Sequence, residues 1–577
     1  MEKCRKVFAA AAAMILLASA CASIQGAGLD GALADETVDA WITLAQDNIQ
    51  IQGSGATVSG NTVTILVGGT YGLRGLLTEG QVVVDARGQD TVKLLLSGAE
   101  VRNSTDAALR VSNAGSTILL LDAGTENCFQ SGQKLDVTTA QKDDSAAGGA
   151  IYARDDLTIQ GSGTLIVGGY INNGIHTTNA LVVEGGDIRI EALNDGLKGK
   201  DSVTVRDGSI VITAGGDGIQ ANDTTGEGYG TITLEGGSIQ IVSQGDGIQA
   251  ETALTITAGE IDVTAGGGSG QAQTMLTEKW GKSGRWPQGW DMEEEDTVSA
   301  KGLKSGTALT VSGGEITVDT KDDGLHSNGT IRICGGGVAV SSGDDGIHAD
   351  DGLWIEAGEI QILQSYEGLE ANQITLSGGN ISIVSSDDGV NANGGSAAMG
   401  GRGGMASGTA GEMPNLIISG GTLRVNAEGD GLDSNGNLLI QGGVVVVDGP
   451  QSSGNGALDS GSESGGVCQV SGGTVLAIGA AGMAESFGEG SAQCSFFCTV
   501  SGIRAGSQLT IQDSEGQVLF THTAAKSASS VVFSSPELRV GQTYTLTVDG
   551  QPTQITQTAV TTGAGGYGPN SFMRRGW

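Results

Sequence analysis

The chain has 577 residues, of which 100 are glycine and 6 are proline, and its 65 acidic side chains outnumber its 29 basic ones. This composition excludes a collagen-like chain and a proline-rich linker. The formal net charge of −36 argues against nucleic acid and anionic membrane surfaces as partners, because both carry negative charge. A surface this acidic attracts cations.

The N-terminus has the features of an export signal. The basic side chains of Lys3, Arg5 and Lys6 precede an apolar stretch over 7–17, which is too short to span a membrane. We therefore expect residues 1–20 to be a signal peptide.

Residues 18–21, which end this stretch, are similar to a bacterial lipoprotein box. Ala18 stands where leucine is usual, and Cys21 occupies the position that is lipidated. We expect lipidation at Cys21, a tether over 21–40, and an extracellular protein anchored to the bacterial cell membrane. Cleavage after Ala20, with free secretion, is the alternative.

Short strand patterns follow one another from about residue 41. The first six are expected at 48–52, 62–67, 81–85, 92–96, 108–111 and 117–121. Apolar and polar residues alternate in them, as in half-buried strands, but their spacing is irregular. We interpret them as the first, imperfect turns of a repeat.

The repeat is explicit between about 150 and 480. Its marker is the glycine in phrases such as Asp344-Asp345-Gly346-Ile347-His348, and most of the gaps between these glycines are 21 or 22 residues. We call them the ladder glycines: Gly174, Gly196, Gly218, Gly247, Gly302, Gly324, Gly346, Gly368, Gly389, Gly431 and Gly456. A fixed period of this size is typical of a solenoid, in which each repeat buries its apolar face against the next.

One repeat contains three short apolar segments, for example 309–311, 316–318 and Leu325. Ser-Gly-Gly and Asp-Gly steps separate them, and we expect these glycines to supply the positive φ of tight corners. Three strands and three corners in about 22 residues predict one coil of a right-handed parallel β-helix. The expected fold is therefore all-β, with this helix over 41–485.

Two insertions and a C-terminal unit interrupt or end the period. The insertions are expected at 266–299 and 394–414. Antiparallel strand patterns over 486–560 predict a small β cap on the open end of the helix, where unpaired strand edges invite aggregation. Residues 561–577 are expected to be a flexible tail.

Stacked coils turn each repeat position into a column with rungs about 4.8 Å apart. The residue before the ladder glycine, which defines the aspartate column, is a carboxylate at eight of eleven positions. Neighbouring carboxylates at that distance repel by roughly 3 kcal/mol at an effective dielectric constant near 20. Such a column must be protonated, well hydrated or filled by cations, and Ca²⁺ prefers oxygen ligands. The predicted metal ligands are Asp195, Asp217, Asp246, Asp322, Asp323, Asp344, Asp345, Asp387, Asp388 and Asp430. The alternative is that Asp-Gly is simply a favoured corner with hydrated carboxylates.

The residue two places after each ladder glycine defines a second column, the polar strip. Its members are His176, Lys198, Gln220, Gln249, Lys304, His326, His348, Glu370, Asn391, Asp433 and, three places after Gly456, Asp459. A straight strip of hydrogen-bonding side chains matches an extended polysaccharide, and Lys304, His326 and His348 are predicted contacts. A solvated face predicts the same polarity. His326 and His348 together offer the alternative of a transition-metal site.

Three of the protein's six tryptophans, Trp280, Trp286 and Trp290, lie in the first insertion. Exposed aromatic rings bind the apolar faces of sugars, so these residues are predicted to contact a glycan. Packing of the same rings inside the insertion is the alternative.

The sequence resembles the bacterial secreted carbohydrate-binding parallel β-helix family, of the clostridial type that binds cellulose and acidic polysaccharides. The resemblance spans about 41–557 and rests on several segments together. They are 90–96, 124–127, 155–161, 195–201, the Asp-Asp-Gly-Ile-His phrases and 529–535. It implies a right-handed parallel β-helix with bound Ca²⁺, akin to pectate lyases but binding rather than cleaving. Glu367 and Lys301 depart from the acidic pattern, which places Ca²⁺ in doubt on their rungs.

These observations favour a non-catalytic, surface-attached protein that binds plant-type or acidic polysaccharides with Ca²⁺. A Ca²⁺-dependent pectate-type lyase is the second hypothesis, and its candidate bases are Lys198, Lys200, Lys301 and Lys304. A base must lose its proton near neutral pH, whereas nearby carboxylates raise the pKa of a lysine, so binding is preferred. A structural surface adhesin is the third hypothesis.

Overall fold

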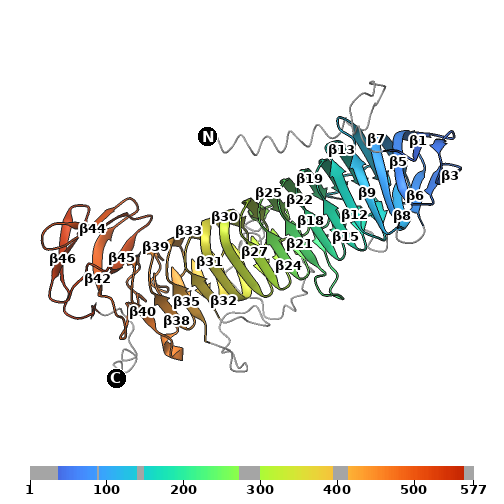
Figure 1. Ribbon diagram of the computed structural model, residues 1–577. Coiled ribbons are helices and arrows are strands. Elements are labelled where there is room, and N and C mark those ends of the chain that lie inside the picture. The colour runs from blue at the N-terminus through green and yellow to red at the C-terminus, as the bar shows by residue number, and fades with distance from the viewer. Residues whose placement is uncertain (1–36, 87–89, 140–147, 272–298, 394–412, 564–577) are drawn as a thin grey trace, which may run out of the picture.

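The computed structural model describes residues 37–86, 90–139, 148–271, 299–393 and 413–563. These residues form an elongated rod, with the first strands at one end and the last at the other (Figure 1). A 44-stranded sheet, most of whose strand pairs are parallel, accounts for nearly all of it. No helix in these ranges has the length and apolar character of a membrane span.

Along most of the rod a strand pairs in parallel with the third strand after it, which produces three columns. For example, Leu303 aligns with Leu325, and Leu325 aligns with Ile347. The first column contains β4 (Thr62–Ile65), β6 (Gln81–Asp85), β8 (Leu109–Asn113), β11 (Gly149–Ala153), β14 (Asn173–Thr177), β17 (Leu197–Gly199), β20 (Ile219–Ala221), β23 (Ile248–Ala250), β26 (Leu303–Ser305), β29 (Leu325–Ser327), the first residues of β31 (Ile347–Gln364) and β32 (Leu369–Leu376), β34 (Val390–Ala392) and β37 (Leu432–Ser434).

The other two columns have the same stacking. The second contains β9 (Ser116–Leu121), β12 (Leu157–Gly161), β15 (Ala180–Val183), β18 (Ser202–Val205), β21 (Thr231–Leu234), β24 (Ala253–Ile256), β27 (Ala308–Val311), the start of β30 (Thr330–Ser342), later parts of β31 and β32, β35 (Asn415–Ile418), β38 (Asn437–Ile440) and β40 (Cys468–Val470). The third contains β10 (Glu126–Ser131), β13 (Thr164–Gly169), β16 (Asp187–Ala192), β19 (Ser209–Ala214), β22 (Ser238–Ser243), β25 (Glu260–Ala265), β28 (Glu315–Thr320), the ends of β30 and β31, β33 (Asn380–Ser385), β36 (Thr422–Ala427), β39 (Val444–Asp448) and β41 (Thr474–Gly479).

The two ends of the rod use antiparallel pairs. At the N-terminal end these pairs involve β1 (Ala40–Ala45), β2 (Gln50–Gly53), β3 (Ala56–Ser59) and β4, followed by β5 (Gly69–Leu77) and β7 (Thr91–Asn103), which pair in parallel. At the C-terminal end, β45 (Ala528–Ser534) pairs with both β41 and β42 (Ser495–Ile503), and β42 also pairs with β48 (Thr561–Thr562). Beyond them lies a separate antiparallel sheet of β44 (Val518–Thr523), β43 (Gln508–Gln512), β46 (Thr543–Val548) and β47 (Gln551–Thr556).

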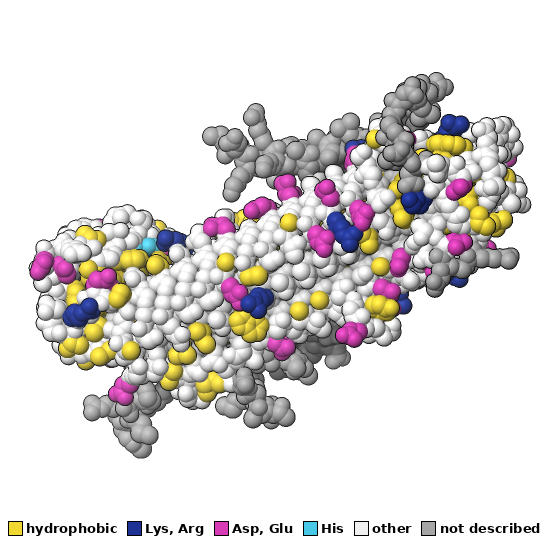
Figure 2. Space-filling model, viewed as in Figure 1, with side chains coloured by type: hydrophobic (Ala, Val, Ile, Leu, Met, Phe, Trp, Pro, Cys, Tyr) yellow, Lys and Arg dark blue, Asp and Glu magenta, His cyan; other side chains and the backbone are white. Residues whose placement is uncertain are grey.

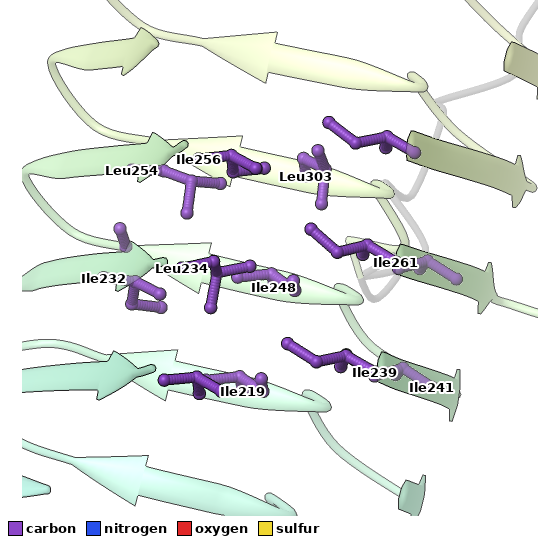
Figure 3. Packing of buried hydrophobic residues seen from close by; sticks show 14 of the residues in the cluster. Ile219, Ile232, Leu234, Ile239, Ile241, Ile248, Leu254, Ile256, Ile261 and Leu303 are labelled. Carbon is purple, nitrogen blue, oxygen red and sulfur yellow. The ribbon is translucent and has the colours of Figure 1, made fainter. Parts of the chain in front are cut away.

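Alternation along each strand builds the core. In β22, Ile239 and Ile241 are buried while their neighbours face outward, and in the next rung Ile261 aligns with Ile239 (Figure 3). Side chains of similar shape therefore stack along the inside of the rod. Complete burial of one such side chain contributes about 1.5–3 kcal/mol.

The ladder glycines correct one expectation. None of them has a positive φ; that conformation occurs instead at the second glycine of Gly-Gly steps, such as Gly314 with φ of 88°. A Cβ added to Gly324 would lie 2.5 Å from the carbonyl oxygen of Gly346 and 2.3 Å from Val340 Cγ1. Glycine is needed before the strip because successive rungs approach too closely for any side chain.

Candidate functional site

The carboxylates of the aspartate column form a hydrogen-bonded ladder. The backbone N–H of Asp217 donates to Oδ1 of Asp195 (3.1 Å), and the N–H of Asp246 donates to Oδ1 of Asp217 (2.8 Å). The same bond links Asp345 to Asp323 (3.2 Å). In these rungs the carboxylate accepts a hydrogen bond from the backbone N–H of the next rung. The Asp-Gly corners are therefore partly structural, but several of their carboxylates are buried rather than hydrated.

The second carboxylate oxygen faces the polar strip. Lys198 Nζ lies 2.9 Å from Asp195 Oδ2, and Gln220 Nε2 lies 2.5 Å from Asp217 Oδ2. Sequence reasoning treated the column and the strip as separate features. The side chains of the column and of the strip are in contact. The ladder glycine turns the chain between them, so residues three apart in sequence lie on the same surface.

The strip is continuous in register and extends further toward the N-terminus than predicted. Cross-strand partners connect Arg110, Tyr152, His176 and Lys198 in succession. The guanidinium of Arg110 lies 5.5 Å from the ring centroid of Tyr152, whose ring meets His176 edge-on at 5.3 Å. This aromatic part of the strip was missed because the 22-residue spacing does not hold there.

Lysine side chains form ion pairs with several carboxylates in the first part of the column. Lys304 Nζ lies 3.0 Å from Asp246 Oδ2. Lys301 Nζ lies 3.2 Å from Asp322 and 2.6 Å from Asp323, so an ammonium group already occupies this rung. Burial alone would lower the pKa of Lys301, but the charges of Asp323 and Asp322 raise it above its ordinary value.

All four lysines proposed as bases are ion-paired. Lys198, Lys301 and Lys304 contact column carboxylates, and Lys200 Nζ lies 3.3 Å from Asp223.

The character of the strip changes at the two histidines. His326 Nδ1 lies 2.8 Å from Asp323 Oδ2, and its Nε2 lies 2.8 Å from Asn328 Oδ1. The ring of His348 meets that of His326 edge-on at 5.0 Å. Beyond His348 the strip is acidic or neutral.

We call the next part the acidic segment: Glu367, Glu370, Asp388, Asn391, Asp430, Asp433 and Asp459. Burial and the charge of Asp388 raise the pKa of Asp433 to about 8. Burial and the charge of Glu370 likewise raise the pKa of Glu367 to about 8. Burial raises the pKa of Asp430 to about 7. No lysine or arginine in the described residues forms an ion pair with this segment.

The acidic segment fits a hard cation such as Ca²⁺. Carboxylate oxygens of Asp388, Asp430 and Asp433 lie within 4.8 Å of one another. Asn391, which is 7% exposed, has a buried Oδ1 without a hydrogen-bond partner and lies in register between Glu370 and Asp433. An all-oxygen donor set with an unsatisfied amide oxygen is the ligand chemistry that Ca²⁺ prefers.

The structure brings only some of the predicted site residues together. Asp387 is half-buried beside Asp388, whereas Asp344 is exposed. The predictions for Trp280, Trp286, Trp290 and Cys21 lie outside the described residues. The sequence analysis did not predict as ligands Glu367, Glu370, Asn391, Asp433 and Asp459, although the loss of basic residues from the strip after His348 was a signal for them.

On the face shown in Figure 2, acidic side chains are scattered along the rod with few basic ones.

Comparison with known proteins gives a family match. The family described as "Carbohydrate-binding domain-containing protein" matches residues 59–346 and 329–412. A protein of that description from Acetivibrio thermocellus is 31% identical over 189 residues, which are 33% of this chain and 65% of that relative. A solved structure of a polysaccharide lyase-like protein from C. thermocellum, a gadolinium derivative, is 34% identical. It covers 40% of this chain and 92% of that chain with a TM-score of 0.37.

Proposed function

Because this chain belongs to the carbohydrate-binding domain-containing protein family, we propose that it is a non-catalytic protein that binds a linear polysaccharide along its polar strip. The observation that carries the proposal is the unbroken cross-strand register of the strip from Arg110 to Asp433. Its rungs are about 4.8 Å apart, so the strip offers hydrogen-bonding side chains in a straight row.

We infer that the three strand columns are the faces of a right-handed parallel β-helix with coils of about 22 residues. In that arrangement the strip runs along one outer face of the rod. The Tyr152 ring supplies an apolar surface for a sugar ring at one end. The lysines and amides that follow supply hydrogen bonds to hydroxyl or carboxylate groups.

Ca²⁺ is proposed to be held by Asp388, Asp430 and Asp433, with the amide oxygen of Asn391 nearby. When bound, it would neutralise the carboxylates and offer a positive charge to an acidic glycan. The residues of the acidic segment would hold the cation at the strip, because Glu370, Asn391 and Asp433 belong to both. Plant-type or acidic polysaccharides are the proposed ligands.

The polar strip supports binding over lysis, because the four candidate bases are ion-paired. A pectate-type lyase would need one of these lysines free and neutral. We further propose that the protein is exported by residues 1–20 and attached to the cell surface through Cys21. The mass of the mature N-terminal peptide tests this, since a diacylglyceryl group adds a defined mass.

The test is a pull-down of the mature protein on polygalacturonate and on cellulose, with Ca²⁺ or with EDTA. We expect retention that depends on Ca²⁺ and no rise in the ultraviolet absorbance of unsaturated uronates. Tyr152→Ala should weaken retention, whereas Tyr229→Ala, which alters an exposed tyrosine outside the strip, should not. Unsaturated products would establish the lyase, and no retention on any glycan would favour the adhesin.

A further inference from the structure

His348 lies among four carboxylates, and its ring nitrogens make no ordinary hydrogen bond to them in the described structure. Its Nδ1 lies 3.3 Å from Asp345 Oδ2, 3.7 Å from Glu370 Oε2 and 3.9 Å from Asp323 Oδ2. On the other side of the ring, Nε2 lies 3.5 Å from Asp350 Oδ1. These separations are longer than ordinary hydrogen bonds, and the ligand atoms of Asp345, His348 and Glu370 all lie within 4.8 Å of one another.

The neighbouring His326 does not share this arrangement. Both of its ring nitrogens are engaged at 2.8 Å, one with Asp323 and one with Asn328, and the residue is 8% exposed. His326 therefore packs against His348 and fixes the plane of that ring. His348 has a more exposed side chain, at 26%, and is reachable from solvent.

The carboxylates that face His348 lack another cationic partner. Asp345 is 5% exposed, and in the described residues the ion pairs of Asp345 and Glu370 involve His348 alone. Asp323 differs, because Lys301 and His326 already contact it. One imidazole nitrogen and two carboxylate oxygens, one of them on a buried side chain, thus face one another.

We propose that Asp345, His348 and Glu370 form a binding site for a divalent first-row transition-metal ion of the Zn²⁺ class. Ligand bonds of about 2.0–2.1 Å in tetrahedral geometry place donor atoms roughly 3.3 Å apart. The observed 3.3 Å and 3.7 Å separations from Nδ1 match that spacing with small adjustments. The remaining coordination positions belong to water or to a ligand from solvent.

The contact between His348 Nε2 and the Asp350 carboxylate favours one tautomer of the imidazole ring. If Nε2 carries the proton, it points toward the Asp350 carboxylate and leaves the Nδ1 lone pair for the metal ion. Metal-bound histidines commonly have such a carboxylate on the opposite nitrogen. Asp350 is thus a positioning residue.

The nitrogen donor distinguishes this site, which takes Glu370 from the acidic segment, from the group of Asp388, Asp430 and Asp433. Asp388, Asp430 and Asp433 offer oxygen alone, which suits Ca²⁺, whereas imidazole favours transition-metal ions over Ca²⁺. The two sites adjoin along the strip, so the same rod would hold two kinds of cation. This inference does not depend on glycan binding.

The test is calorimetric titration of Zn²⁺ into the chelator-treated, dialysed protein in the presence of excess Ca²⁺. We expect one Zn²⁺ equivalent that Ca²⁺ does not displace. His348→Gln and Glu370→Gln should each weaken its binding at least about tenfold, and Asp350→Asn should weaken it by about tenfold or more. His176→Gln changes a strip histidine whose strip neighbour is Lys198, and it should leave the Zn²⁺ affinity unchanged.

Circular dichroism and melting curves in EDTA establish that each variant is folded before titration. Wild-type Zn²⁺ affinity in folded His348→Gln would overturn the proposal. Full displacement of Zn²⁺ by Ca²⁺ in the unaltered protein would overturn it as well.

Discussion

The aspartate column is built the same way along the rod, but its charge is balanced differently in two regions. In the lysine-paired region, ammonium groups contact Asp195, Asp246 and Asp323 directly, whereas Asp217 accepts a hydrogen bond from Gln220. In the acidic segment, carboxylates occupy the strip positions that lysines occupy earlier. The ladder of backbone hydrogen bonds continues, as between Asp388 and Asp430 at 2.6 Å. Where the bond is present, one carboxylate oxygen serves the backbone in both regions, and the regions differ in what faces the other oxygen.

The largest expected effect is a dependence of protein stability on pH, caused by the acidic segment. Glu367 and Asp433 have pKa values of about 8 in the folded protein, well above the ordinary values of unfolded carboxyls. Folding therefore favours their protonated forms, so in EDTA the stability is greatest below about pH 4 for these groups and falls as pH rises toward 8. Melting curves from pH 5 to 8.5 measure this. Added Ca²⁺ should abolish the decline, and a flat profile in EDTA would contradict the prediction.

Lys301→Met should destabilise the lysine-paired region by about 3–5 kcal/mol, because it leaves the buried Asp323 carboxylate without its ammonium partner. Chemical denaturation followed by circular dichroism measures the loss. Lys200→Met is the matched control, since the Lys200 side chain is 47% exposed, and its loss should cost less than about 1 kcal/mol. If the two substitutions reduced the stability equally, the buried ion pair would contribute no more than the exposed one, and the prediction would be wrong.

Ladder-glycine substitutions should affect the two regions equally. Gly324→Ala and Gly389→Ala each place a Cβ 2.5 Å from the carbonyl oxygen of the next rung, so each should cost about 1–3 kcal/mol. Gly454→Ala, where an added Cβ meets nothing within 4 Å, is the control. The measurement is the melting temperature. A much smaller cost at Gly389 would mean that the backbone geometry of the regions differs.

The smallest expected effect is a conversion of one region into the other. Asp433→Lys places an ammonium three residues after Asp430, as Lys198 is placed after Asp195. In EDTA at pH 8 we expect the free energy of unfolding to rise by about 1–2 kcal/mol. The substitution removes a buried carboxyl that neighbouring carboxylates repel, and it forms an ion pair. The stabilisation by Ca²⁺ should shrink in the same variant. An unchanged Ca²⁺ response would place the cation elsewhere.

The strand pattern was accessible from sequence because alternation at period two reports burial directly. Ile316 and Val318 illustrate this, since both belong to a predicted apolar segment and both are buried. The role of the ladder glycine was not accessible, because a close approach between rungs depends on side chains and carbonyl groups far apart in sequence. Gly324 meets Gly346 and Val340 only after the parallel strands pair.

The site was predicted in part for a similar reason. Asp388 and Asp430 were found from their repeat position, but Asp433 was assigned to a different surface. Its contribution to the acidic segment depends on the direction of the chain after a one-glycine corner, which spacing alone does not specify. The hydrogen bonds from backbone N–H groups to carboxylates of the preceding rung, such as that from Asp217 to Asp195, were also not predicted, because they join residues far apart in sequence.

The ladder of carboxylate-to-backbone bonds makes each rung dependent on its immediate neighbour alone. The carboxylate of Asp217 accepts a hydrogen bond from the backbone N–H of Asp246, which is 29 residues away. The same kind of bond joins the Asp217 N–H to Asp195, which is 22 residues away. A loop of any length can therefore leave the rod between rungs and return in register. Evolution can lengthen such a protein, or exchange a lysine-bearing rung for an acidic one, by gene duplication of single repeats without redesigning the remainder.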